Sequence, residues 1–146
     1  EWKGSDYDIA CLVGEQDVFE GFENTLNKLF ERVNTTGRVV IGTPYYQQPD
    51  VPKELVDFEG ELPTELEVFD IVRSNHCVIT FIGRDTRSEW DKYISWSARR
   101  HLESYRNEKN AQTKAEMYEW MHRWHEIYLR YRMRYEGWAM YAIERI

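Results

Sequence analysis

The chain has 146 residues and a formal net charge of −7, with 42% hydrophobic and 31% charged side chains. This composition is typical of a folded globular domain, and the length suits a single domain with its own core, so a disordered chain is excluded. The apolar runs are too short to span a bilayer, no secretory signal is visible, and most acidic residues fall in the first half. We therefore expect no membrane partner and no nucleic-acid partner.

Both cysteines, Cys11 and Cys77, fall within apolar runs that predict buried strands. Because cysteine is a common small residue of protein cores, we interpret them as buried thiols rather than as a disulfide or a catalytic nucleophile. Unpaired thiols indicate a reducing cytoplasm. The chain lacks an initiator Met and leads from Glu1 into a strand within a few residues, so we expect a fragment or a processed product.

The first part of the chain has the pattern of a strand–helix–strand unit. Residues 7–13 predict a strand with a buried centre at 9–13, and a polar turn follows at 14–17. A helix is then predicted from apolar residues at helical spacing, which form one face: Phe22, Leu26, Leu29, Phe30 and Val33. Residues 34–37 end this helix, and Gly37 is able to take positive φ there. A unit of this size has parallel strands and a right-handed crossover.

The second strand determines where we look for a site. Residues 39–41 are β-branched and uncharged, which suits a strand buried on both faces, and we expect the strand to break at Gly42-Thr43-Pro44. Ligands of open α/β sheets bind beyond the carboxyl ends of parallel strands. Thr43, Tyr45 and Tyr46 are therefore the first candidate site residues.

A loop at 46–60 follows, with one helical turn around 53–58. The next helix is predicted over 63–74, because Thr64 and Glu67 have capping-box spacing. Its inward face is expected to consist of four apolar residues: Leu62, Leu66, Phe69 and Val72. A third strand is predicted at 77–82, closed by Gly83.

The remainder of the chain is rich in aromatic residues. Thr86 and Glu89 form a second capping-box pattern, which begins a helix that ends before a turn at 107–110. A longer helix is predicted over 111–135, and the two should form an antiparallel hairpin. A last strand is predicted at 138–143. The histidines of the long helix show only one E-x-x-H spacing, so we expect no metal site.

Four segments, taken in order, resemble the second half of a class I S-adenosylmethionine-dependent methyltransferase. They are Tyr7-Asp8-Ile9-Ala10 running to Gly14-Glu15, the helix that leads to the stretch from Thr36-Gly37-Arg38 through Thr43-Pro44-Tyr45-Tyr46, the helix 63–74 and the strand from Cys77. The resemblance implies one α/β domain over 1–146 with a partial Rossmann-like sheet, equivalent to strands four to seven of the family. It also implies that 86–136 is an aromatic-rich helical hairpin inserted before an antiparallel last strand. The family's Gly-rich cofactor turn has no counterpart here.

The resemblance also implies the site residues, although it assigns no catalytic residue. Gly14 and Glu15 would lie near the methionine end of S-adenosylmethionine, the cofactor of the complete parent protein. The residues beside the substrate, including a lid from the first aromatic helix, would be Gln16, Asp17, Thr43, Tyr45, Tyr46, Trp90 and Tyr93. Each also has a structural interpretation, because the loop acids can cap the next helix and the aromatic residues can pack the loop or the core.

We therefore expect the substrate-side portion of a methyltransferase that acts on an unidentified small molecule, inactive as this chain alone. In the family the strand at 9–13 pairs with a neighbour that this chain lacks, so its exposed edge is expected to pair with a second copy or to aggregate. The alternative is a non-enzymatic α/β interaction or oligomerisation domain that uses the aromatic hairpin.

Overall fold

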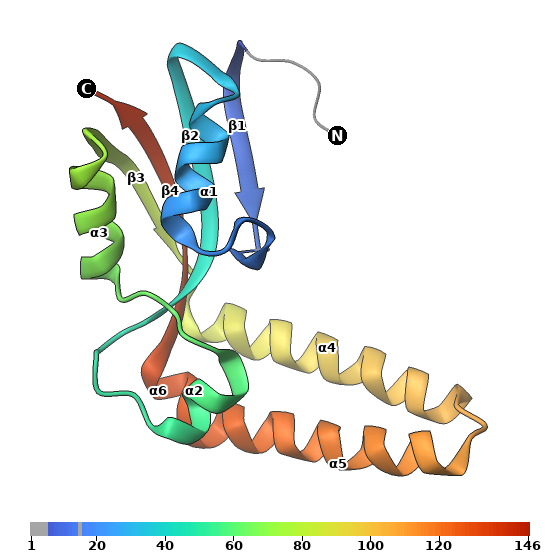
Figure 1. Ribbon diagram of the computed structural model, residues 1–146. Helices are drawn as coiled ribbons and strands as arrows, with labels where there is room; N and C mark the ends of the chain where they lie inside the picture. The colour runs from blue at the N-terminus through green and yellow to red at the C-terminus, as the bar shows by residue number, and fades with distance from the viewer. Residues whose placement is uncertain (1–5, 15) are drawn as a thin grey trace.

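The computed structural model describes residues 6–14 and 16–146 of this mixed α/β fold, shown in Figure 1. One sheet contains the strands in the order β1-β2-β4-β3. Their bounds are Tyr7–Val13 for β1, Val33–Tyr46 for β2, Cys77–Arg84 for β3 and Glu136–Arg145 for β4. β1 and β2 are parallel, whereas β4 is antiparallel to both β2 and β3. The predicted parallel pair and the antiparallel last strand are confirmed.

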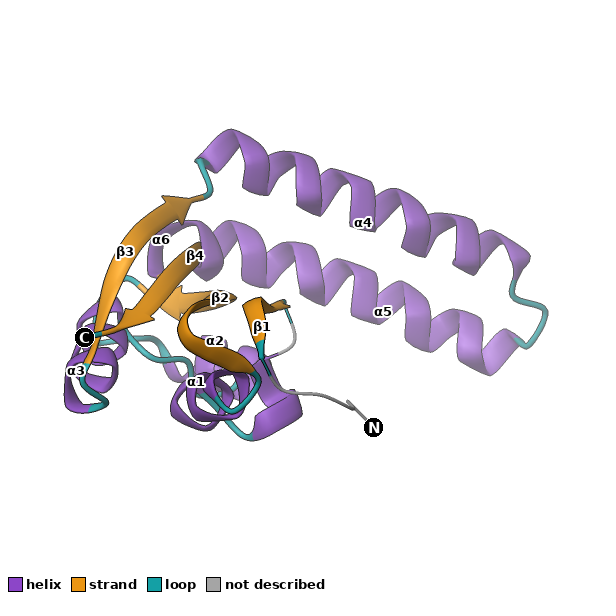
Figure 2. Ribbon diagram, turned by 90° about the horizontal axis from the view of Figure 1, so that it is seen from above, coloured by secondary structure: helices purple, strands orange, loops and turns teal. Residues whose placement is uncertain are grey.

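The helices fall into two groups. α1 and α3 lie on the same side of the sheet, whereas α4 and α5 form an antiparallel hairpin that projects from it as an arm (Figures 1 and 2). The bounds are Gln16–Phe19 for the short η1, Phe22–Phe30 for α1, Lys53–Glu59 for α2, Glu65–Ser74 for α3, Arg87–Asn107 for α4 and Ala111–Ile127 for α5. A π-helical turn, η2 (Tyr128–Arg132), and α6 (Met133–Tyr135) continue α5 to the start of β4. No helix among the described residues is both long and apolar enough to cross a membrane.

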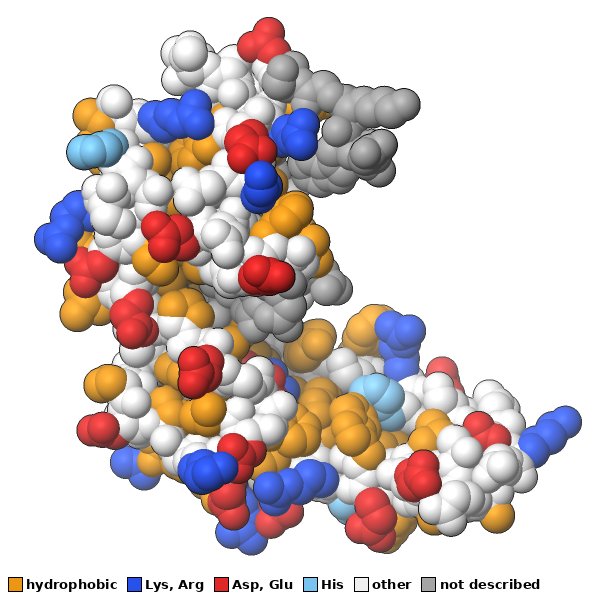
Figure 3. Space-filling view, in the orientation of Figure 1, with side chains coloured by type: hydrophobic (Ala, Val, Ile, Leu, Met, Phe, Trp, Pro, Cys, Tyr) orange, Lys and Arg blue, Asp and Glu red, His pale blue; other side chains and the backbone are white. Residues whose placement is uncertain are grey.

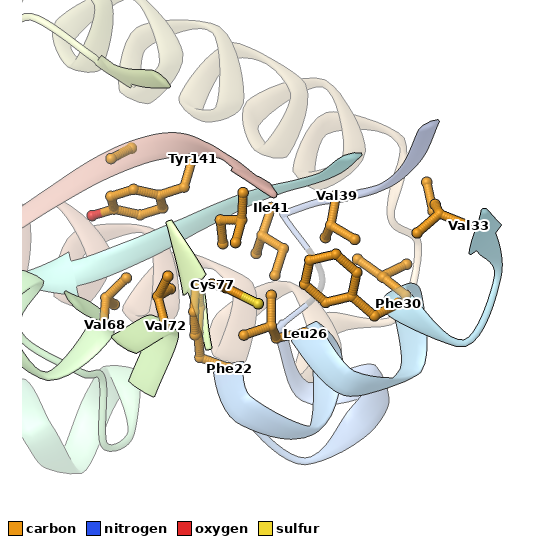
Figure 4. Packing of buried hydrophobic residues seen from close by; sticks show 14 of the residues in the cluster. Phe22, Leu26, Phe30, Val33, Val39, Ile41, Val68, Val72, Cys77 and Tyr141 are labelled. Atoms are coloured by element: carbon orange, nitrogen blue, oxygen red, sulfur yellow. The ribbon is translucent and has the colours of Figure 1, made fainter. Parts of the chain in front are cut away.

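The main core lies between the sheet and the helices α1 and α3 (Figure 4). Side chains of β2 and β4 alternate, so that one face of each strand points at the helices. The fully buried members from all four elements include Leu26, Val39, Val68, Val72 and Ile143. Burial of each such side chain contributes about 1.5–3 kcal/mol relative to exposure, which holds α1 and α3 against β2 and β4.

The opposite face of the sheet is largely open, and this corrects the predicted burial of residues 9–13. Ile9 and Val13 of β1 are 56% and 50% exposed, and only Ala10 is buried. The reason is that β1 is an edge strand covered by helices on one side only. Cys11 is likewise exposed, whereas Cys77 is buried as predicted, and both are free thiols.

The bounds of β2 differ from the prediction at both ends. Val33 belongs to the strand rather than to the helix, and Gly37 does not have positive φ. Gly37 instead permits close approach, because a Cβ there would lie 2.7 Å from the Cβ of Val33. The strand does not break at Gly42, since β4 pairs with it as far as Tyr46. β1 ends opposite Gly42, so Pro44 lies where β2 has a free edge and its missing N–H is tolerated.

The buried face of α3 also differs from the prediction. Leu62 and Val72 are buried as predicted, but Leu66 and Phe69 are 68% and 47% exposed. Val68, which is not among the predicted inward residues, is fully buried instead. The helix carries apolar residues on more than one face, so periodicity alone does not decide which face packs against the sheet. Both predicted capping boxes are present, with Thr64 and Thr86 as the N-caps.

Candidate functional site

The carboxyl ends of β1 and β2 meet the start of β4 and the base of the helical arm at one corner of the molecule. Two adjoining cavities of about 450 and 210 Å3 lie there. Four residues line both cavities: Asp85, Trp90, Arg132 and Glu136. Figure 3 shows the molecule hollowed between the sheet and the arm, with hydrophobic side chains gathered in the corner. This is the edge of the sheet at which the topology predicts a ligand.

The positions of these side chains follow from the ends of the elements that carry them. The backbone N–H of Asp85 donates to the carbonyl of Trp138 at 3.1 Å, which ties the end of β3 to β4. Trp90 stands in the first turn of α4, where the capping box of Thr86 sets the beginning of the helix. Arg132 lies in the π-helical turn just before β4. Such turns are frequent at functional sites because they displace side chains from the regular helical register.

A buried ion-pair cluster forms the floor of the cavities. Arg132 and Glu136 are only 9% and 3% exposed. The guanidinium donates from Nε to Oε2 of Glu136 at 2.8 Å and from Nη2 to Oε1 at 3.0 Å. The Nε of Arg132 also lies 3.3 Å from Oε1 of Glu59, and its guanidinium carbon, Cζ, lies 5.0 Å from the centre of the Trp90 ring. Arg132 therefore joins two carboxylates and one aromatic wall.

The carboxyl groups of this region hold protons more readily than usual. Burial raises the pKa of Glu136 to about 7, against the opposing effect of the Arg132 guanidinium. Burial also raises the pKa of Glu59 and of Asp85. Removal from water disfavours the charged form of each group. The carboxyl group of Glu136, at the floor of the cavities, can therefore gain or lose a proton near neutral pH.

Two glycines allow aromatic side chains to form the walls. A Cβ on Gly137 would lie 2.5 Å from the ring of Tyr45, and a Cβ on Gly42 would lie 2.6 Å from the ring of Trp138. Both contacts are shorter than carbon atoms tolerate, so each ring packs directly against the backbone of a neighbouring strand.

The structure brings together only part of the set of predicted site residues. Gly14 and Tyr93 line the larger cavity, Tyr45 lines the smaller one, and Trp90 lines both. Gln16 and Asp17 belong to η1 at the end of β1, and Glu15 lies outside the described residues.

Two other predicted site residues, Thr43 and Tyr46, do not line either of these cavities. Thr43 is only 2% exposed. Tyr46 packs with Leu55 and Ile127, and its hydroxyl donates to the carbonyl of Gly60 at 2.6 Å. Burial raises the pKa of Tyr46 to about 12, so this phenol stays protonated.

Sequence reasoning missed several lining residues, namely Glu59, Asp85, Tyr128, Arg132, Glu136 and Trp138. The only local signal was the i, i+4 spacing of Arg132 and Glu136 at the end of a helix, which is usually a surface pair. Within the described part of the chain, no group of three metal-ligating side chains could hold a metal ion.

No protein-family model and no curated protein sequence matches this chain. Solved structures with a similar fold include YjhP from Escherichia coli, with a TM-score of 0.83 and 20% identity over 99% of this chain and 61% of that one. An S-adenosylmethionine-dependent methyltransferase from Geobacter sulfurreducens in complex with S-adenosyl-L-homocysteine has a TM-score of 0.83 and 18% identity, over 99% of this chain and 60% of that one. A methyltransferase from Thiobacillus denitrificans, with the same ligand, has a TM-score of 0.81 and 16% identity over the same shares, 99% and 60%.

These likenesses establish the fold. The chain has the Rossmann-like fold of part of a class I S-adenosylmethionine-dependent methyltransferase, and it spans about three fifths of the length of these solved structures. The sheet order β1-β2-β4-β3 with an antiparallel β4 agrees with the predicted strands four to seven of that fold.

Proposed function

We propose that this chain supplies the substrate side of an S-adenosylmethionine-dependent methyltransferase that acts on a small molecule. The observation that carries the proposal is the pair of cavities at the carboxyl ends of β1 and β2, on a fold shared with proteins solved in complex with S-adenosyl-L-homocysteine. Cavities of about 450 and 210 Å3 suit a small acceptor rather than a macromolecule.

The end of β1 fits the cofactor. Gly14 has φ of +84°, and no atom of the described residues other than Gly14 itself and its chain neighbours lies within 4 Å of the position that a Cβ would take, so a ligand can approach its backbone. Its N–H donates to the carbonyl of Gly42 at 2.9 Å, which holds the ends of β1 and β2 together. When bound, S-adenosylmethionine would supply an electrophilic methyl group. Gly14 would hold its methionine end, as the sequence resemblance implies.

The side chains of the cavity would orient the acceptor and exclude water. Trp90, Tyr93 and Trp138 give flat apolar walls, and Tyr45 closes the smaller cavity. Positioning of the two reactants is the largest requirement of a displacement of this kind, because little proton chemistry is needed at the methyl group. The pKa values of Glu59 and Asp85 are raised, so either carboxylate can take a proton from the small molecule that receives the methyl group.

The proposal extends to location and assembly. A reducing cytoplasm is supported by the free thiol of Cys11, which is exposed and unpaired. Pairing of β1 with a second copy is supported by its position at the edge of the sheet, where no other described strand lies beside it. Light scattering tests this assembly, and Val13→Lys should abolish it because a charge on this strand opposes edge pairing.

A second function, a non-enzymatic interaction domain, is favoured by one observation. The arm exposes large aromatic side chains, among them Trp96 at 57% and Trp120 at 44%. Exposed aromatic residues on a helical hairpin are typical of interaction surfaces. This alternative requires no cofactor binding.

Calorimetric titration with S-adenosyl-L-homocysteine separates the two functions. We expect the protein as its gene encodes it to bind this ligand, and Gly14→Leu to weaken binding at least tenfold. Gly21→Leu is the matched control, because Gly21 also has positive φ and open space around it but does not line either cavity. Equal effects of the two substitutions, or an absence of binding, would overturn the proposal. A tight complex with residues 1–146 alone would refute the assignment of this chain to the substrate side.

A further inference from the structure

The larger cavity carries an excess of negative charge. Among the described residues, its charged lining consists of Glu59, Asp85, Glu136 and one cation, Arg132. The guanidinium makes both of its hydrogen bonds to Glu136, which it neutralises. Glu59 shares the same cation through an ion pair at 3.3 Å, so three carboxylates face one guanidinium. Because Arg132 donates no hydrogen bond to Glu59, both Glu59 and Asp85 keep acceptor oxygens for a ligand.

Glu59 has an unmet hydrogen-bonding requirement. Its Oε1 is buried and has no hydrogen-bond partner in the described part of the chain. It lies 3.3 Å from Nε of Arg132, but that N–H already donates to Glu136. The side chain is 18% exposed, so it reaches the cavity while most of it is removed from water. A buried acceptor of this kind is stabilised when a ligand donates to it.

Asp85 is the second available carboxylate. Its backbone is fixed by the bond to Trp138, whereas no hydrogen bond or ion pair engages its carboxylate within the described residues. The nearest acidic neighbour, Glu89, is occupied by the capping box of α4. A cationic ligand would thus meet one carboxylate from the end of α2 and one from the end of β3.

The walls between these carboxylates are aromatic. Trp90, Tyr93 and Trp138 line the same cavity. The face of Trp90 already attracts a cation, since the guanidinium carbon of Arg132 lies 5.0 Å from its centre. Aromatic faces combined with carboxylates are the usual means by which proteins recognise organic ammonium groups.

We propose that the larger cavity binds an organic ammonium group, with Glu59 and Asp85 as its counter-charges and Trp90 and Tyr93 as its aromatic contacts. This inference deepens the proposed function, on which it rests. A bound ammonium group that carries a proton would give it to Glu59 or Asp85. The nitrogen of the amine so formed would then bond to the methyl carbon of S-adenosylmethionine as the bond from that carbon to sulfur breaks, and S-adenosyl-L-homocysteine would leave. Anionic acceptors are disfavoured in this cavity because they would face two carboxylates. Arg87 lines only the smaller cavity and does not compensate them there.

The test compares choline with its uncharged isostere, 3,3-dimethylbutan-1-ol, as probes in a tryptophan-fluorescence titration of the chain. The two molecules have nearly the same shape, so the ratio of their affinities measures the charge alone. We expect choline to bind at least tenfold more tightly. Glu59→Gln and Asp85→Asn should each reduce that ratio about three- to fivefold, which is the effect of one partly solvated ion pair.

Glu61→Gln is the matched control, because it removes the same charge two residues away at a position that does not line this cavity. Equal affinities for the two probes, or an equal effect of Glu61→Gln and Glu59→Gln, would overturn the inference.

The probes need no cofactor, so their relative affinities test this inference by themselves. Methyl transfer is measured separately on the protein as its gene encodes it, with S-adenosylmethionine and N,N-dimethylethanolamine, an amine whose nitrogen can accept a methyl group. A preference for choline over its isostere without methyl transfer to the amine would contradict the proposed function and leave this inference standing. Methyl transfer together with equal affinities for choline and 3,3-dimethylbutan-1-ol would support the proposed function and overturn this inference.

Discussion

Replacement of Arg132 by Met is the most direct perturbation of the site, because one buried cation serves two carboxylates. Met keeps the apolar stem of the side chain but is shorter than Arg and carries no charge. Glu136, which is 3% exposed, then loses both of its hydrogen bonds, and Glu59 loses its ion pair. Removal of one partner from a buried pair costs about 3–5 kcal/mol, since the remaining charge stays in a medium that solvates it poorly.

The loss of stability should depend on pH. With Arg132 present, burial raises the pKa of Glu136 to about 7, and removal of the guanidinium raises it further. A carboxyl group whose pKa is higher in the folded than in the unfolded state stabilises the fold below the unfolded pKa, and this contribution is lost as pH rises through the folded pKa. The folded variant therefore keeps Glu136 neutral at pH 5, and its deficit should be smaller there than at pH 8 by about 1 kcal/mol or more.

Urea denaturation followed by tryptophan fluorescence at pH 5 and pH 8 measures both quantities. We expect the free energy of unfolding of Arg132→Met to fall by about 3–5 kcal/mol at pH 8. The double variant with Glu136→Leu should recover a large part of that loss, because no carboxylate is then left in the most buried position. A deficit that does not change with pH, together with a double variant no more stable than the single one, would refute the reasoning.

Three further substitutions test the packing around the site. Gly42→Ala should lower the free energy of unfolding by about 1–3 kcal/mol, because its Cβ would overlap the ring of Trp138, and a change below 0.5 kcal/mol would contradict that contact. Val68→Ala should cost about 2 kcal/mol and Leu66→Ala about zero in the same urea titration, and the reverse order would show that α3 buries its other face. Thr86→Ala should lower the thermal midpoint by removing about 1 kcal/mol of N-cap stabilisation, and an unchanged midpoint would argue against the capping box.

Local rules of sequence account for the parts of the fold that depend on local physics. The capping boxes at Thr64 and Thr86 and the apolar run at 77–82 each identify one element, because the residues that stabilise it are neighbours in the chain. The burial of a strand, in contrast, depends on residues that are distant in the chain. The sequence pattern of an apolar strand such as 9–13 does not distinguish a central strand from an edge strand. The exposure of these residues in β1 therefore follows only from the order of the strands in the sheet.

The candidate site was likewise predictable from the sequence in one respect, its location, and not in another, its charged residues. Its location follows from the topology, because parallel strands that end at one edge of a sheet leave a crevice there. Its charged residues could not be predicted, since Glu59, Asp85 and Arg132 come from three segments that meet only in the folded chain. The π-helical turn matters most, because a regular helix through Arg132 would place its guanidinium at a different angle to Glu136.

The larger cavity and the open face of the sheet belong to one surface. Pro44 and Trp138 alternate with the buried residues of β2 and β4, so they point away from α1 and α3, and both line the cavity. Exposed apolar residues of the neighbouring strands, among them Val13 and Phe81, continue the same face. Any segment or second chain that covers this face must therefore also change the access of water to Glu59 and Asp85. Coverage of the sheet and affinity for a cationic ligand are consequently coupled, because the attraction of the two carboxylates for an ammonium group strengthens as water is excluded.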